Sequence, residues 1–214
     1  MNNNLTRIGL IIAAVGVFIL GSFGGWWKGY EPKATVMDKP NPLLTPKFKI
    51  YQTQLTGWDN EKKAWEIEAE KVWQSEDGNL VYFEDITKGV IYSVKKKRVD
   101  FTAGWARWEK LRRELYIGNG FQATIDKGVL VTAEAVMKFR TEEMICAQAV
   151  DYQDSDSLMK AKRMKINFLK EELFLDGDVQ LTQAKDVVRA NGLTYSLKKK
   201  IYRLKEPQGV TLHL

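Results

Sequence analysis

The stretch Ala161 to Leu181, AKRMKINFLKEELFLDGDVQL, shows the pattern from which most of this chain is built. Apolar residues alternate with polar ones on both sides of a charged tip, residues 170–172. Alternation of this kind indicates a strand with one buried and one solvated face, and two such runs joined by a short polar link predict a β-hairpin. A single hairpin cannot bury its own apolar face, so the unit needs neighbours of the same kind.

The same unit recurs at a nearly regular interval. Its leading alanine has counterparts 34, 30, 28 and 29 residues apart, a mostly apolar residue follows three positions later, and the later copies share a charged tip. The alanines are Ala69, Ala103, Ala133, Ala161 and Ala190, the residues three positions on are Val72, Ala106, Val136, Met164 and Leu193, and the tips are LRRE at 111, RTEE at 140, LKEE at 169 and LKKK at 197. A period of this length predicts stacked units that cover one another's apolar faces. We therefore expect an all-β, elongated fold of stacked antiparallel hairpins.

The net charge of the chain indicates which kinds of partner it could bind. Residues 31–214 carry 31 basic and 27 acidic side chains, a net charge of +4, which favours anionic partners such as phosphorylated lipids or a membrane surface. The two signs of charge are interspersed, which argues against a nucleic-acid interface. Cys146 is the only cysteine and lies in an alternating run, so we expect an ordinary half-buried strand residue.

The N-terminal region differs from the rest of the chain. Residues 8–27, IGLIIAAVGVFILGSFGGWW, contain no charge and have the length of a bilayer-spanning helix. We interpret residues 1–30 as a cytoplasmic tail and a retained anchor, with a cleaved signal peptide as the alternative. Residues 31–46 contain all but one of the prolines and should form an extended tether to a single domain, residues 47–214.

The sequence lacks the groups that most enzymes need. It has no glycine-rich phosphate loop, no serine elbow and no cysteine pair for zinc, and its one histidine, His213, is the penultimate residue. Hydrolytic enzymes need a positioned base together with a nucleophile or a metal. We therefore expect no enzymatic activity, no metal and no cofactor.

Large apolar side chains dominate the positions that alternation assigns to the inner face. They could form a sealed core, or they could line a trough in which acyl chains replace side chains, and a tether to a membrane favours the trough. The last strand, expected at residues 210–214, would be an edge to which another β-protein could add a strand. The inward positions are Phe48, Ile50, Trp65, Ile67, Phe83, Phe101, Trp105, Ile117, Phe139, Ile166, Phe168, Leu173 and Leu175.

At this point the sequence resembles the LptC family over essentially its whole length. The apolar N-terminal stretch and the short tether are part of the resemblance, and their order and spacing relative to three short blocks carry the rest. These blocks are Gly57 with WEIEA at 65–69 and Val72, then FTA at 101–103 with Ala106, LYI at 115–117 and Gly120-Phe121, and finally residues 173–179 with Gly177.

The resemblance implies a twisted β-jellyroll, or β-taco, in a single-pass inner-membrane protein whose C-terminal domain lies in the periplasm. Such a protein accepts lipopolysaccharide from an inner-membrane ABC transporter complex of the LptB, LptF and LptG type and passes it to a periplasmic bridge protein of the LptA type. The inward residues would then contact lipid, Gly57 would lie at the transporter end, and Gly177, Val210 and Leu212 would lie nearer the bridge protein. The alternative is a membrane-anchored β-repeat scaffold with a closed core and no lipid ligand.

Overall fold

The computed structural model describes residues 48–93 and 98–211. The predicted anchor and tether, Leu212 and His213 lie outside the described residues. The chain divides into two units, Met1–Ala34 and Thr35–Leu214, and every described residue belongs to the second. Among the described residues, no helix has the length and apolar character needed to cross a membrane.

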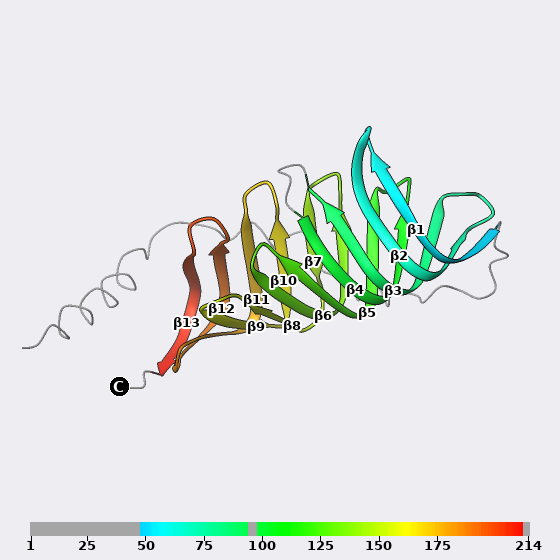
Figure 1. Ribbon diagram of the computed structural model, residues 1–214. Helices are drawn as coiled ribbons and strands as arrows, with labels where there is room; N and C mark the ends of the chain where they lie inside the picture. Colours follow the sequence, from blue (N-terminus) through cyan, green and yellow to red (C-terminus); the bar gives the residue numbers. More distant parts are fainter. Residues whose placement is uncertain (1–47, 94–97, 212–214) are drawn as a thin grey trace, which may run out of the picture. The chain divides into compact units, whose positions relative to one another are not determined.

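The described residues form one antiparallel sheet of thirteen strands, which confirms the all-β prediction. The strands follow one another in nearly the order of the sequence, from β1 at one edge to β13 at the other (Figure 1). Two positions in the sheet are each filled by a pair of short strands, because β7 and β8 both pair with β6, and β10 and β9 both pair with β11. The strands are β1 (Phe48–Asp59), β2 (Lys62–Gln74), β3 (Leu80–Tyr92), β4 (Arg98–Glu109), β5 (Glu114–Ile125), β6 (Gly128–Lys138), β7 (Glu143–Cys146), β8 (Val150–Gln153), β9 (Ser157–Ala161), β10 (Arg163–Asn167), β11 (Glu172–Gln183), β12 (Asp186–Ser196) and β13 (Ile201–Thr211).

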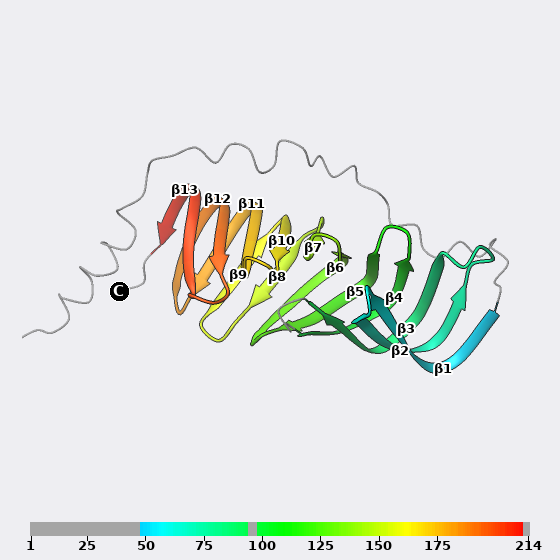
Figure 2. The same ribbon diagram turned by 90° about the horizontal axis from the view of Figure 1, so that it is seen from above.

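A crease crosses the sheet near the middle of its strands. Register shifts occur within the pairings of β2 with β3, β3 with β4, β4 with β5, β5 with β6, β11 with β12 and β12 with β13. Irregularities of this kind bend a strand and increase its local twist, and Figure 2 shows the strands curving along their length.

The repeated alanines mark this crease. Ala69 and Ala190 adjoin register shifts, Ala103 lies inside one, Ala133 falls in the unpaired step of β6, and Ala161 ends β9 just before β10 begins. All of them except Ala133 are buried. The period found in the sequence therefore records the position where each strand bends.

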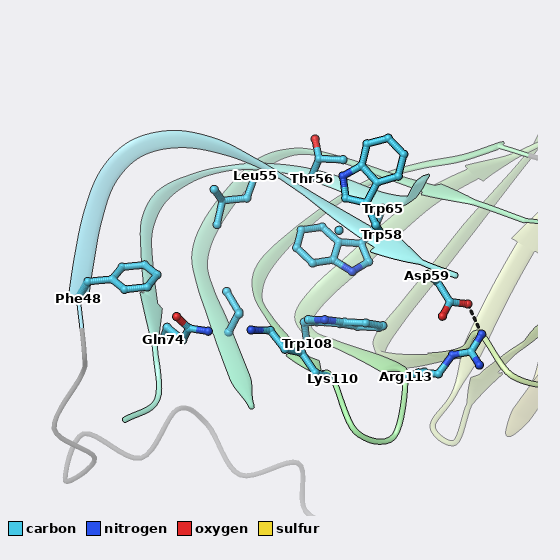
Figure 3. Close-up of a pocket in the computed structure, with 12 residues that line it drawn as sticks. Phe48, Leu55, Thr56, Trp58, Asp59, Trp65, Gln74, Trp108, Lys110 and Arg113 are labelled. Carbon is cyan, nitrogen blue, oxygen red and sulfur yellow. Dashed lines mark hydrogen bonds and ion pairs between the residues drawn. The ribbon is translucent and has the colours of Figure 1, made fainter. Parts of the chain in front are cut away.

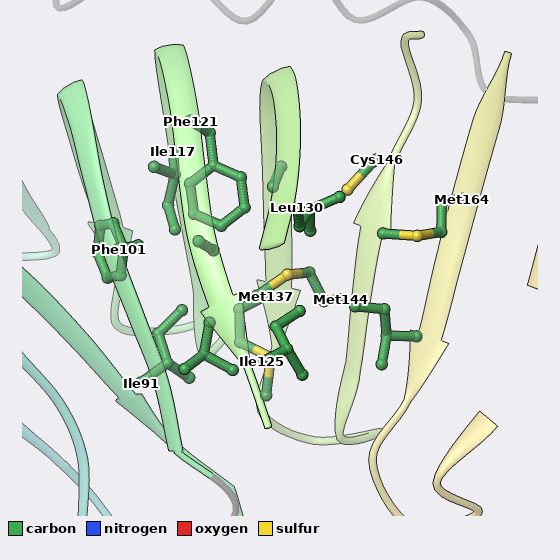
Figure 4. Packing of buried hydrophobic residues seen from close by; sticks show 14 of the residues in the cluster. Ile91, Phe101, Ile117, Phe121, Ile125, Leu130, Met137, Met144, Cys146 and Met164 are labelled. Carbon is green, nitrogen blue, oxygen red and sulfur yellow. The ribbon is translucent and has the colours of Figure 1, made fainter. Parts of the chain in front are cut away.

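Bending at the crease brings the two halves of the sheet face to face. The turns at 75–79, 110–113, 139–142, 168–171 and 197–200 form the first rim, and the turns at 60–61, 126–127, 154–156 and 184–185 belong to the second rim. Trp65 in the half next to the second rim packs edge-on against Phe83 in the other half, with ring centroids 5.3 Å apart. The interior between the halves is an apolar core, in which side chains such as Ile117, Met137 and Met144 gather (Figure 4).

The charged tips predicted from the repeat are turns of the first rim, and the backbone links each one to the next. The amide of Phe139 donates to the Arg113 carbonyl at 3.1 Å, that of Phe168 to Glu142 at 3.0 Å, and that of Leu197 to Glu171 at 2.9 Å. The residue that closes each of these tips has a positive φ, from 52° at Glu142 to 59° at Arg113. The tips thus form a ladder along the rim.

Residue type and alternation misplace several boundaries when they are applied along the chain. Gly57 to Asn60 are typical turn residues, yet the turn lies at 60–61, because Gly57 and Trp58 continue β1. The apolar runs within β3, β5 and β13 look like separate strands, but each pair forms one strand, since the alternation breaks at the crease while the pairing continues. The polar stretch 151–157 looks like a loop, but only 154–156 form one, because Asp151 to Gln153 pair as β8.

Candidate functional site

The inner face is formed largely by the residues that the sequence assigned to it. Ten of the thirteen predicted positions belong to the buried core, each at most 5% exposed: Trp65, Ile67, Phe83, Phe101, Ile117, Phe139, Ile166, Phe168, Leu173 and Leu175. These side chains therefore pack in the apolar core between the two halves of the sheet. Their contact with lipid stays a prediction.

Phe48 and Ile50 lie on the same face but at the open edge of the sheet. They pair with Gln74 and Val72 of β2, and no strand of the described residues lies on the other side of β1. Their exposed fractions are 37% and 40%, because no further strand covers them. The inner face is therefore accessible at the β1 end.

Trp105, which was also predicted to point inward, is buried outside the main core cluster. Ala106 and Trp108 belong to the main core cluster, whereas Trp105, although only 6% exposed, does not. Trp105 pairs with Glu84 and Gly118 on the outer face. The register shift between Thr102 and Trp105 reverses the alternation, which no rule of simple periodicity could anticipate.

A cavity of about 550 Å³ opens at the β1 end (Figure 3). We call it the mouth cavity; it is lined by Phe48, Leu55, Thr56, Gly57, Trp58, Asp59, Trp65, Gln74, Val81, Trp108, Lys110 and Arg113. Its lining combines several large apolar side chains with one carboxylate and two cations. A volume in this range suits part of a ligand with an apolar body and a few polar groups.

Gly57 shapes this cavity. It pairs with Trp65 across β1 and β2, and the indole ring lies where a side chain on residue 57 would be. The Trp65 ring also packs edge-on against Trp108, with centroids 5.8 Å apart. Gly57 was predicted to lie at a partner interface, and the structure places it in the wall of the mouth cavity.

An ion pair crosses the mouth. Asp59 lies at the second rim and Arg113 at the first, and a guanidinium Nη2–H of Arg113 donates to the Asp59 carboxylate (Figure 3). The side chains are 17% and 29% exposed, so the pair is largely shielded from solvent. The contact joins the two rims beside the cavity.

A second group of polar side chains joins the rims near the other end of the sheet. Asp154 of the second rim accepts hydrogen bonds from the Tyr195 hydroxyl and from the Ser157 hydroxyl, the latter at 2.9 Å, and the Lys200 Nζ lies 3.6 Å from it. Burial alone would raise the pKa of the Asp154 carboxyl, but these hydrogen bonds, that of the Asp156 amide and the Lys200 charge hold it below its usual range. The carboxylate is therefore charged and satisfied although its side chain is only 4% exposed.

The remaining predicted partner residues occupy different places. Val210 lies in β13, an edge strand with one neighbour, and is 54% exposed. Gly177 lies at the crease of β11, where its carbonyl accepts from the Lys162 amide at 2.9 Å, and both β12 and β13 separate it from the free edge. The positive φ of 77° gives Gly177 a local reason to be glycine.

The described residues contain no group of three or more His, Cys, Asp or Glu side chains that could hold a metal ion. Cys146 is fully buried in the core, and burial raises the pKa of its thiol to about 12. Such a thiol is a packing residue and a poor nucleophile in the folded chain.

Sequence reasoning missed the polar groups that join the rims. Asp59 and Arg113 are 54 positions apart, and both lie in stretches that read as solvated turns. Only the folding of the sheet along its crease brings such residues together. The charged tips correctly predicted turns, but they did not indicate which residues of the two rims contact each other.

Two comparisons with known proteins found matches to this chain. The family model described as "Lipopolysaccharide-assembly, LptC-related" matches residues 12–210. Among solved structures, the chain is similar to LptH, the LptA homologous periplasmic component of the conserved lipopolysaccharide transport device from Pseudomonas aeruginosa, with 10% identity, a TM-score of 0.49, and coverage of 54% of this chain and 95% of that chain. No curated protein matches the sequence significantly. The family match spans nearly the whole chain and confirms the resemblance seen in its motifs: the chain belongs to the LptC family, and its role lies in lipopolysaccharide transport.

Proposed function

We propose that this protein accepts lipopolysaccharide from an inner-membrane ABC transporter complex and passes it to a periplasmic β-jellyroll bridge protein. The acyl chains would lie between the two halves of the creased sheet, and the polar head would project between the rims. The protein would be anchored in the inner membrane by residues 1–30 and would carry its β-domain in the periplasm. It would act without a cofactor and without enzymatic chemistry.

The observation that carries this proposal is the apolar inner face together with its opening at the β1 end. Because β1 is an edge strand, the interior reaches solvent through the mouth cavity. At the opposite edge, no strand in the described part of the chain covers the outer side of β13, so its backbone is available to a second β-protein. A lipid could therefore enter at one end of the sheet and leave at the other.

The packed core supports a second candidate. Side chains such as Leu115, Phe121 and Met159 have no exposed surface, so the two halves of the sheet are in contact along the interior. A structural scaffold would need no more than this. A conduit additionally requires that the halves part when lipid is present.

Site-specific photocrosslinking in intact cells distinguishes the two candidates. Phe101 is 4% exposed and faces the core, whereas its neighbour Thr102 is exposed on the outer face and serves as the matched control. The conduit predicts lipopolysaccharide adducts from a photoreactive residue at 101 and none from one at 102. Absence of adducts at both positions, in a folded protein during active export, would support the closed scaffold.

A further inference from the structure

The mouth cavity contains hydrogen-bond donors that nothing in the described chain uses. Nε1 of Trp65 and Nε of Arg113 are buried, and neither has an acceptor among the described residues. Both residues line the cavity, and Trp65 is only 3% exposed. Because a buried donor without an acceptor is costly, oxygen atoms of a ligand at this place would stabilise the site.

The charges around the cavity favour an anion. Among the described residues that line it, Lys110 and Arg113 are the cations and Asp59 is the one carboxylate. The ion pair with Asp59 occupies one Nη atom of Arg113 and leaves Nε without a partner. A guanidinium group binds phosphate through two parallel hydrogen bonds, so Arg113 has unused capacity of the right kind.

The apolar side chains beside these cations narrow the class of ligand. Phe48, Leu55 and Trp108 line the same cavity. A free phosphate ion would gain no binding energy from these apolar surfaces. A lipid that bears a phosphate at the boundary between its sugar and its acyl chains matches both parts of the lining.

We propose that Arg113 binds a phosphate of the incoming lipid and gives up Asp59 as its partner when it does so. This inference rests on the proposed function, because the lipid is the cargo of that function. Asp59 and Arg113 belong to opposite rims, so the exchange removes a contact that joins the rims beside the mouth cavity. The bound lipid therefore widens the existing entrance, and a lipid without phosphate does so poorly.

Asp59 and the phosphate compete for the same guanidinium group, which gives the proposal a signature that an ordinary structural ion pair lacks. Arg113→Gln should weaken binding of the phosphorylated lipid by about tenfold, because charge-assisted hydrogen bonds are lost. Asp59→Asn should strengthen it, because the competing carboxylate is gone. A purely structural pair would respond in the same direction to both changes.

The test uses the full-length chain in detergent and a fluorescent lipopolysaccharide, in its native form and after enzymatic removal of the lipid phosphates. Arg112→Gln is the matched control, since Arg112 belongs to the same turn, has a side chain 69% exposed and pairs with Glu109. We expect native affinity from this control, a loss with Arg113→Gln and a gain with Asp59→Asn. Both effects should disappear with the dephosphorylated lipid.

The outcomes separate this inference from the proposed function. If the protein binds neither lipid, the proposed function is wrong. If it binds both lipids equally, if the two variants shift affinity in the same direction, or if inorganic phosphate binds to the cavity without any preference for the phosphorylated lipid, only the role of Arg113 is overturned. Near-ultraviolet circular dichroism checks the fold of each variant; if Arg113→Gln does not fold, the direction of the Asp59→Asn effect decides alone.

Discussion

The indole ring of Trp65 lies directly over Gly57, so a Cβ atom on residue 57 would come within 2.0 Å of the ring carbon Cε2. The contact involves the rigid part of a buried side chain, which is also held by Phe83 and Trp108. No small adjustment can therefore remove the overlap. A glycine at this position lets the aromatic wall of the mouth cavity form.

Gly57→Ala should destabilise the protein and change the shape of the mouth cavity. The ring of Trp65 must move into already packed neighbours, and overpacking of this kind costs about 1–3 kcal/mol. Urea unfolding followed by circular dichroism measures the loss. Gly209→Ala is the control, because a Cβ atom there would meet no heavy atom within 4 Å; equal losses from the two variants would contradict the packing argument.

Tyr195→Phe should destabilise the protein through Asp154. The Tyr195 hydroxyl donates to a buried carboxylate, and hydrogen bonds to charged groups contribute about 1.5–3 kcal/mol. The ring itself stays, and with it the stacking on Tyr202, whose ring centroid is 4.8 Å away. Tyr92→Phe is the comparison, because that hydroxyl donates to the partly exposed Glu66 at 3.3 Å. A loss no larger than that of Tyr92→Phe would show that Asp154 does not depend on this donor.

The stabilisation by Asp154 should also depend on pH. The folded state holds the pKa of this carboxyl below its ordinary value of 3.8. Its contribution to the free energy of unfolding is therefore fully present above that ordinary value and is lost as the pH falls through the lower pKa of the folded state.

Unfolding of the native protein and of Asp154→Asn at about pH 6 and about pH 3 tests this dependence. The native protein should be the more stable of the two at the higher pH, and the difference should shrink at the lower pH. Asp178→Asn provides the control, since Asp178 is 69% exposed in its pair with Lys162 and such pairs contribute little. A difference between native protein and Asp154→Asn that stays constant with pH would mean that the Asp154 carboxylate is not the group responsible.

The repeat in the sequence was sufficient to predict the all-β class and four turns of the first rim, but not the path of each strand. Period-two alternation and the charged tips are local properties, and the tips placed the turns at 110–113, 139–142, 168–171 and 197–200 correctly. The crease is a property of pairing between strands: at Thr102 to Trp105 a register shift reverses which side chains point inward. Alternation carried through that shift assigned Trp105 to the inner face, but the residue is buried outside the main core cluster.

Part of the candidate site could likewise be predicted from the sequence and part could not. The apolar inner face follows from residue type and spacing, so Ile67, Phe101 and Phe168 were found. The polar contacts across the rims depend on which turns meet when the sheet folds over. Asp59 and Arg113 are far apart along the chain, so no local pattern in the sequence indicates that they form a pair. Gly57 was noticed through a family resemblance, and its physical reason, the ring of Trp65, became visible only in the structure.

Cys146 offers a direct measure of whether the groove opens. It is the only cysteine of the chain, its side chain has no exposed surface, and burial raises the pKa of its thiol to about 12. N-ethylmaleimide reacts with the thiolate, so labelling of the folded full-length protein at about pH 8 should be at least about a hundredfold slower than labelling in urea. Thr102→Cys in a Cys146→Ala background should label quickly, because residue 102 is exposed on the outer face.

If lipid passes between the two halves of the sheet, labelling of Cys146 in membranes should change when export is switched on, while labelling at position 102 should not. Rapid labelling of Cys146 in the resting protein would show that the core between the halves is already open.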